Sequence, residues 1–297
     1  MPSTTLLESL KPIPFNNGLV RIGSSQDGGY LSPDDLQGLQ ACFSPGAENR
    51  KTFEDDLSLN HNIPCHICDF SSNHDSFQTP LIPGLQTFEK VWLSSHTSQT
   101  SMRLQDWVKL RAPGTSDLIL QLDIEGGEYE ILEASPQELL DRFRVIIIEL
   151  HDLDKILLNP QNNDREIKAL QKLFYSHICV HAHPNNCCGE TLDPFSKMNI
   201  PNTLEVTLLR KDRLSDISSS LKKNSKYHLL PHPLDIARSV KHHPPIHLNS
   251  FWINKHLKRH PLSHLRIAAD WIDFFIKKPI YTGLRTKLRK LLKTHQQ

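Results

Sequence analysis

Short apolar runs separated by polar turns recur along the first two thirds of the chain and predict alternating strands and helices. The clearest run spans residues 118–122, is apolar except at Gln121, and is typical of a strand buried on both faces. Gly126 and Gly127 follow, and apolar residues return at helical spacing over residues 129–132. This order of strand, tight turn and helix predicts a parallel strand of an open α/β sheet.

The same alternation continues on both sides of this unit. Helices are predicted around residues 53–57, 104–110, 133–143 and 167–174. The last predicted strand follows its predecessor without a strong intervening helix, which favours an antiparallel final strand in a mostly parallel sheet. The predicted strands are residues 39–43, 64–70, 87–93, 118–122, 144–151, 177–183 and 204–209.

A turn signal precedes the sheet. Asp27, Gly28 and Gly29 lie between apolar segments at residues 18–22 and 30–31, which predicts a β-hairpin or a strand–loop element. A plain surface turn without a functional role is the alternative.

Polar residues and a glycine stand where predicted strands end. Gly46 follows the first strand, Asp69 ends the second, and Asp123 and Glu125 follow the fourth. Ligands of open α/β sheets gather outside the carboxyl ends of the strands, so we expect these residues at a functional rim. Asp69 lies 23 residues beyond Gly46, near the spacing at which a carboxylate accepts hydrogen bonds from a ribose. Capping of the following helix is the alternative role for Asp123 or Glu125.

Other common sites fit less well. A single glycine follows the first strand, whereas dinucleotide binding uses three spaced glycines, which argues against a nicotinamide-dependent dehydrogenase. Cys65 and Cys68 are three apart on a strand and point to opposite faces, which disfavours a metal or redox role. A zinc site at His181 and His183 is disfavoured because proline, asparagine and two adjacent cysteines follow them. A polar loop that faces the substrate, or a purely structural loop, is expected there.

Composition is typical of a soluble protein, with 38% hydrophobic residues and a mean hydropathy of −0.41. No apolar run approaches the ~20 residues needed to span a bilayer. The N-terminus has no basic cluster followed by an apolar core, so no secretory signal is expected. Six cysteines without regular spacing predict reduced thiols in a cytoplasmic protein.

Charge divides the chain. Residues 255–297 hold eleven Lys or Arg and two Asp, a net charge of +9, whereas the remainder carries −8. We therefore expect a main domain over residues 1–255, including the hairpin, and a basic amphipathic helical tail over residues 256–297. The basic and leucine-rich residues 285–293 fit peripheral contact with the inner face of a membrane, or a solvated helix packed on its own domain. Nucleic acid binding is not expected, because the body is acidic and carries no recognisable binding module.

The order of Gly46, Asp69 and Asp123 at successive strand ends resembles S-adenosylmethionine-dependent methyltransferases, whose Rossmann-like sheet has seven strands. More narrowly, the chain resembles the FkbM family. Residues 123–128, Asp-Ile-Glu-Gly-Gly-Glu, match the family's signature of Asp-x-Glu-Gly-(Ala/Gly)-Glu at the fourth strand. Residues 43–58 resemble its cofactor loop and first helix, and the resemblance covers residues 18–255 in order.

The resemblance implies S-adenosylmethionine as cofactor and a role for each matching residue. Ser44, Gly46 and Glu48 would surround the methionine part of the cofactor. Asp69 would bind the ribose hydroxyls, and Phe70 would pack against the adenine. On the substrate side, the flanking segments imply contacts from Asp27, Tyr30, His183, Asn185 and Asn186.

The implied reaction is methylation of an oxygen acceptor, such as a sugar or another hydroxyl-bearing substrate. A hydroxyl is a poor nucleophile at neutral pH, so it needs a general base or a metal ion. We expect Asp123, which would also stand near the sulfonium, as the base, with His151 and Glu125 as further candidates. A magnesium ion held by Asp123 and Glu149 is the metal-dependent alternative. The competing function class is a non-catalytic module that binds S-adenosylmethionine or a nucleotide.

Overall fold

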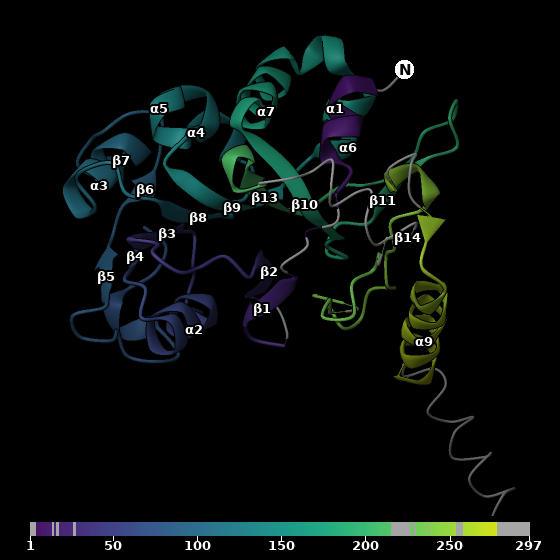
Figure 1. The fold of residues 1–297 in the computed structure, drawn as a ribbon, viewed down its shortest axis with the longest axis horizontal. Coiled ribbons are helices and arrows are strands. Elements are labelled where there is room, and N and C mark those ends of the chain that lie inside the picture. Colours follow the sequence, from purple (N-terminus) through teal and green to yellow (C-terminus); the bar gives the residue numbers. More distant parts are fainter. Residues whose placement is uncertain are drawn as a thin grey trace, which may run out of the picture.

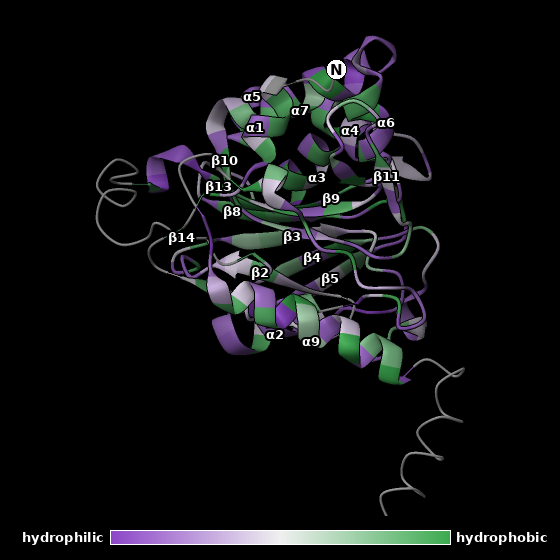
Figure 2. Ribbon diagram, turned by 90° about the vertical axis from the view of Figure 1, so that its right-hand side faces the viewer, coloured by the Kyte–Doolittle hydropathy of each residue, from purple (hydrophilic) through white to green (hydrophobic). Residues whose placement is uncertain are grey.

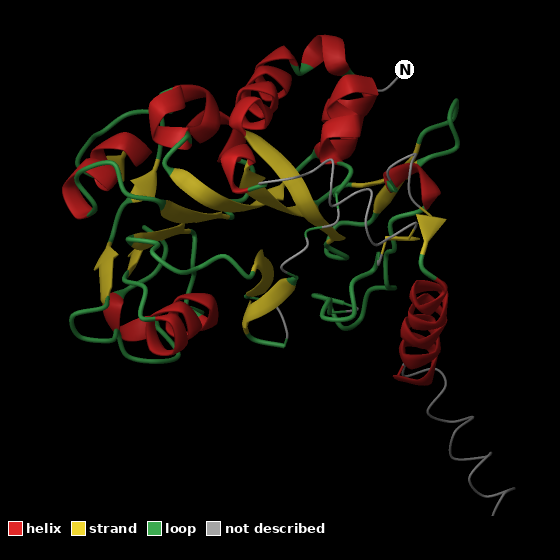
Figure 3. Cartoon of the chain, viewed as in Figure 1, coloured by secondary structure: helices red, strands yellow, loops and turns green. Residues whose placement is uncertain are grey.

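The computed structural model describes residues 4–13, 15, 18–25, 28–214, 227–228, 230–236, 238–253 and 258–277. The predicted substrate residue Asp27 and the basic residues 285–293 lie outside the described residues. Among the described residues, one seven-stranded sheet organises the fold (Figures 1 and 3).

The sheet has the strand order β10-β13-β9-β8-β3-β4-β5. Because β4 and β5 extend it to one side of β3 while β8 and β9 extend it to the other, the winding reverses between β3 and β8. β13 runs antiparallel to both of its neighbours, and the other pairs are parallel. These features confirm the predicted strands and the antiparallel last strand. The strands are β3 (Ala41–Pro45), β4 (Cys65–Cys68), β5 (Gln86–Glu89), β8 (Leu118–Leu122), β9 (Phe143–Leu150), β10 (His177–Pro184) and β13 (Leu204–Arg210).

Both faces of the sheet are covered (Figure 1). One face is covered by a layer of six helices, called the main helical layer. The other face is covered by α2 (Thr52–His61) and by the predicted hairpin of β1 (Leu19–Gly23) and β2 (Gly29–Pro33). In β8, Leu118, Leu120 and Leu122 pack into the helical layer, while Ile119 packs toward the hairpin side. Burial on both faces therefore explains the near-continuous apolar run of this strand. The main helical layer holds α1 (Thr4–Leu10), α3 (Leu104–Arg111), α4 (Glu128–Ala134), α5 (Gln137–Leu140), α6 (Leu153–Leu158) and α7 (Asp164–Ser176).

Two predicted elements differ from the observed ones. The helix expected over residues 133–143 is divided at Pro136, which cannot continue a helix because it lacks an N–H group. The strand expected over residues 87–93 ends at Glu89, and β6 (Trp92–Leu93) pairs outside the main sheet with β7 (Ser101–Met102). The remaining short elements are β11 (Glu190–Leu192), β12 (Asn199–Pro201), β14 (Tyr227–His228), β15 (Lys258–Arg259) and 3-10 helices at His74–Ser76, Pro160–Asn162, Lys211–Arg213 and Ser250–Trp252.

The described C-terminal residues pack beside β10. His181 Nε2 lies 2.8 Å from Asp235 Oδ1, and Asn186 Nδ2 donates to the Val240 carbonyl at 2.9 Å. The last described helix, α9 (Pro261–Lys277), lies within the helical tail predicted over residues 256–297. Within the described part of the chain, no helix has the length and apolar character needed to cross a membrane.

Candidate active site

A cavity of about 760 Å³ opens at the carboxyl ends of β3, β4, β8 and β9. This is where the winding of the sheet reverses, which is the usual ligand position in open α/β folds. Its volume suits a cofactor together with part of a substrate. The predicted site residues that line it are Tyr30, Gly46, Glu48, Asp69, Asp123, Glu125, Glu149, His151 and Asn185.

Gly46 lies in the cavity wall, where the ends of β3, β4 and β8 come close together. Its φ of 81° lies in the left-handed region, which glycine adopts without steric cost. A Cβ atom at this position would clash with the carbonyl oxygen of Asp123. Its own N–H donates to the Cys68 carbonyl at 3.0 Å. The absence of a side chain therefore allows the ends of β3, β4 and β8 to meet.

Asp69 is a buried carboxylate on the cavity wall. It accepts the Glu48 N–H at 2.8 Å, the Ser71 N–H at 2.7 Å, and hydroxyl hydrogen bonds from Ser71 at 2.6 Å and Ser72 at 3.2 Å. These four bonds fix its orientation and use the acceptor sites of the carboxylate. A ligand hydroxyl would bind Asp69 by replacing one of the rotatable serine hydroxyls.

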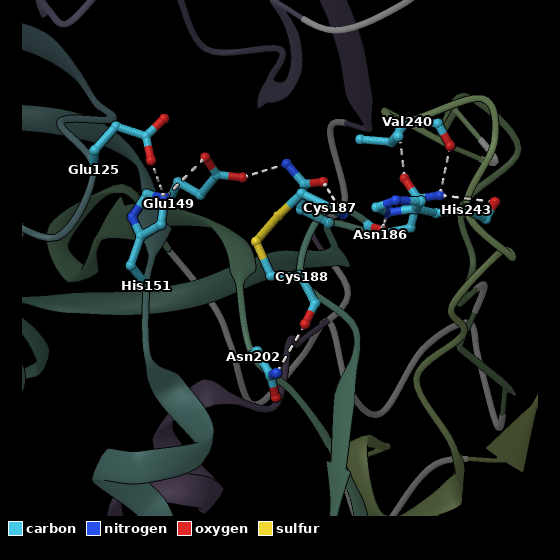
Figure 4. The surroundings of a disulfide bond; sticks show 10 residues. Glu125, Glu149, His151, Asn186, Cys187, Cys188, Asn202, Val240 and His243 are labelled. Carbon is cyan, nitrogen blue, oxygen red and sulfur yellow. Dashed lines mark hydrogen bonds and ion pairs between the residues drawn. A yellow bond between two sulfur atoms is a disulfide. The ribbon is translucent and has the colours of Figure 1, made fainter.

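Carboxylates surround one histidine where β8 and β9 end. Nε2 of His151 lies 3.5 Å from Glu125 Oε2 and 3.6 Å from Glu149 Oε2 (Figure 4). Nδ1 of His151 lies 3.1 Å from Glu128 Oε1. Asp123 borders Glu149, and its Oδ1 atom is buried without a hydrogen-bond partner in the described structure. Oε2 of Glu128 is likewise buried without a partner, but of these two residues only Asp123 lines the cavity.

Burial determines the protonation of this cluster. It raises the pKa of Glu149 to about 7, with a further contribution from the Glu205 carboxylate. Burial and then the charge of Glu149 raise the pKa of Asp123 well above its usual range. For His151, burial alone would lower the pKa, but the hydrogen bond with Glu128 and the surrounding carboxylates raise it to about 9. At neutral pH His151 is therefore cationic, while Glu149 gains or loses its proton near pH 7.

Comparison with known proteins agrees with this geometry. Residues 45–168 match the family model described as the methyltransferase FkbM domain. This segment of 124 residues is therefore similar to an FkbM methyltransferase domain. The matched segment contains Gly46, Asp69, Asp123, Glu149 and His151, which together line the cavity.

No curated protein matches the chain. Among solved structures, a fibrillarin/Nop5p complex is 11% identical, over 59% of this chain and 74% of that chain, with a TM-score of 0.33. A SAM-dependent methyltransferase from Anabaena variabilis ATCC 29413 is 8% identical, over 58% of this chain and 77% of that chain, with a TM-score of 0.29.

Glu128, the last acid of the FkbM signature, has a supporting role. It is fully buried, and its Oε1 accepts the Ile124 N–H at 2.9 Å and the Gly126 N–H at 3.2 Å. It therefore satisfies the turn before α4 and also orients His151. Glu128, rather than Asp123, is the acid that caps this turn, and this removes the capping alternative for Asp123.

Two residues expected at the cofactor lie behind the cavity wall. Ser44 is fully buried, contacts Glu54, and donates to Gln121 Oε1 at 2.7 Å. Phe70 packs against Trp92 with ring centroids 5.5 Å apart, and Trp92 is the ring that lines the cavity. Trp92 is 50% exposed, so it offers an aromatic surface to a ligand base. The sequence pattern missed it because residues 87–93 were predicted to form one sheet strand.

Of the residues predicted to contact the substrate, some line the cavity and others lie behind its wall. Tyr30 and Asn185 line the cavity, and Asn185 Nδ2 donates to Glu149 Oε1 at 2.5 Å. His183 instead lies buried, with its Nδ1 3.6 Å from Asp235 Oδ2. The Asn186 side chain donates a hydrogen bond to the Val240 carbonyl. These two residues stabilise the packing of the C-terminal segment rather than line the cavity.

Cys187 and Cys188 form a disulfide bond at the cavity wall (Figure 4). The expectation of six reduced thiols is therefore wrong for this pair, while the other four cysteines are free and buried. The Cys187 N–H donates to Asn185 Oδ1 at 3.0 Å, which links the pair through Asn185 to Glu149.

A divalent cation fits the cluster at the ends of β8 and β9. Asp123, Glu125 and His151 each offer one donor atom within 4.8 Å of the others. The contact of His151 Nδ1 with Glu128 leaves Nε2 for a metal once the Nε2 proton has been released, which is the usual arrangement of a histidine ligand supported by a carboxylate. A donor set with an imidazole suits a transition-metal ion better than the oxygen-preferring magnesium ion that the sequence analysis gave as the metal-dependent alternative.

Proposed function

We propose that the FkbM domain transfers a methyl group from S-adenosylmethionine to a hydroxyl group of a sugar or a related acceptor. The observation that carries this proposal is the convergence of Gly46, Asp69 and Asp123 on one cavity. In our assignment the methionine part of the cofactor lies along Gly46, its ribose reaches Asp69, and its adenine packs against Trp92. The sulfonium then faces the carboxylates beyond β8.

The cofactor supplies an activated methyl group, so the protein must align the acceptor and remove its proton. The pKa of Glu149 is raised to about 7 and that of Asp123 well above its usual range, so this pair holds protons more strongly than free carboxylates, as a general base requires. We assign Asp123 as the base, because its free oxygen is buried in the site, and Glu149 as the group that raises its pKa. Cationic His151 cannot accept a further proton, and it holds the carboxylates in place.

If a metal ion is bound, Asp123, Glu125 and His151 would hold it, and it would lower the pKa of the acceptor hydroxyl. The protein residues keep the same positioning roles. Glu128 fixes the imidazole, and Asn185 fixes Glu149.

Binding and turnover distinguish an enzyme from a binding module. Isothermal titration with S-adenosylmethionine and mass spectrometry of products from a panel of hydroxyl-bearing glycans test the proposal together. Binding with addition of one methyl group to a glycan supports it. Binding without product on any acceptor favours the non-catalytic module, and the absence of both contradicts a methyltransferase.

Asp69→Asn is expected to weaken S-adenosylmethionine binding by about tenfold, because the amide nitrogen cannot accept a hydroxyl hydrogen bond (about 1.5–3 kcal/mol for a bond to a charged group). Titration calorimetry measures the change. Asp75→Asn is the matched control, since the side chain of Asp75 is 99% exposed on the same loop. Equal affinity of Asp69→Asn and the parent protein would remove Asp69 from the cofactor site.

The rate of turnover is expected to decrease as the pH falls below about 7. Glu149 has its pKa raised to about 7, and protonation of the Asp123–Glu149 pair at lower pH removes the proton acceptor. In Glu149→Gln the negative neighbour of Asp123 is lost, so the acidic limb of kcat/KM should move to lower pH. Glu133→Gln, an exposed change on α4, should leave the profile in place, and an unshifted limb in Glu149→Gln would contradict the pairing.

A further inference from the structure

The outward side of α9 is apolar along its whole length. Leu262, Leu265, Ile272 and Ile276 are 58%, 68%, 57% and 47% exposed, and Ala269 lies between them at the same helical spacing. We call these five residues the α9 apolar face. Figure 2 shows apolar residues along α9, most of them in its C-terminal half.

Two charged residues of α9, Asp273 and Arg266, contact the body of the protein, whereas the side chain of Lys277 at the helix end is 66% exposed. Asp273 Oδ2 lies 2.7 Å from Arg238 Nη2, and the Arg238 guanidinium stands 5.4 Å from the ring of Phe274, which is buried. Arg266 donates to the Pro233 carbonyl at 2.5 Å. An ordinary surface helix buries its apolar side and exposes its charges, so the polarity of α9 is reversed.

This reversed polarity is held by specific contacts. The charged side fixes α9 to residues 230–247, and rotation of the helix would break the Arg238 and Arg266 contacts. A contiguous exposed apolar surface of this kind marks an interaction site.

The sequence around α9 indicates the chemistry of the partner. Lys258 and Arg259 precede the helix, and residues 278–297 contain six Lys or Arg and no Asp or Glu. An apolar helix face flanked by basic residues is the pattern of helices that lie in the interface of an anionic bilayer. A second copy of the chain is a poorer match, because it would bring two strongly basic segments together.

We propose that the α9 apolar face inserts into the headgroup region of an anionic lipid membrane. The helix lies along the surface and does not cross the bilayer. This inference concerns location and holds whether or not the methyl acceptor is a glycan. It extends the expected peripheral membrane contact from residues 285–293 to a described helix of the same tail.

Vesicle co-sedimentation of the full chain tests the proposal. We expect binding to vesicles of phosphatidylcholine with phosphatidylserine, much weaker binding to phosphatidylcholine alone, and weaker binding as salt concentration rises. Leu265→Glu should reduce binding to the anionic vesicles by about tenfold or more, because it places a charge in the inserted face. Leu59→Glu is the matched control, since Leu59 is 67% exposed on α2, and it should bind as the parent does.

Thermal unfolding of the two variants checks that both remain folded. Equal vesicle binding by Leu265→Glu and the parent would overturn the proposal. So would a parent protein that does not bind anionic vesicles. If that protein is a dimer in sedimentation analysis, and the dimer dissociates in Leu265→Glu, the apolar face is a contact between two copies.

Discussion

Asp123→Asn is expected to lower methyl transfer by about 10²–10⁴-fold, the usual contribution of a positioned general base. The amide keeps the shape of the side chain but cannot take a proton from the acceptor. It also removes one of two neighbouring buried carboxyl groups, so we expect the fold to be retained. Turnover assays and titration calorimetry should show lost activity with S-adenosylmethionine binding retained.

A control for Asp123→Asn is available on α7. Asp164 is an exposed acid with its side chain 71% accessible, and Asp164→Asn should leave both turnover and binding unchanged. Full activity of Asp123→Asn would transfer the role of base to Glu149 and would contradict our assignment.

Gly46→Ala is expected to abolish detectable cofactor binding and to lower the melting temperature. The substitution adds strain at a positive φ, about 1–3 kcal/mol, and forces the new Cβ against the Asp123 carbonyl oxygen. The ends of β3 and β8 must then separate, which moves both the cofactor loop and the base. Calorimetry and thermal unfolding measure the two effects.

Gly84→Ala separates backbone strain from the close approach. Gly84 has a φ of 79°, and a Cβ there would meet no atom within 4 Å. It should lower stability by the strain alone and leave cofactor binding intact. If Gly46→Ala bound S-adenosylmethionine as tightly as Gly84→Ala, the contact of Gly46 with Asp123 would have no role in shaping the site.

The sheet was predictable from sequence because its strands are buried on both faces and read as apolar runs. The polar residues that end these strands were predictable as a group, because the carboxyl ends of parallel strands lie at the same edge of the sheet. Asp69, Asp123 and Glu149 therefore meet as expected.

Side-chain direction beyond the strand ends was not predictable. Ser44 is one residue too early to reach the cavity, and Phe70 is displaced from it by Trp92, which comes from a small separate sheet. The buried position of Glu128 depends on a turn whose N–H groups it satisfies, and periodicity does not report such contacts. For α9, the spacing of apolar residues predicts a helix. Which side of the helix faces water depends on two contacts, Asp273 with Arg238 and Arg266 with the Pro233 carbonyl.

The wall of the cavity is divided between two parts of the chain. The cofactor side belongs to residues 45–168, whereas Tyr30, Asn185, Cys187 and Val240 enter from segments before and after this match. Loops can change without disturbing a rigid sheet. We therefore expect proteins with this domain to differ in their acceptors through changes in these peripheral segments. The cofactor side of the cavity would stay unchanged, so the same reaction would be carried out on different molecules.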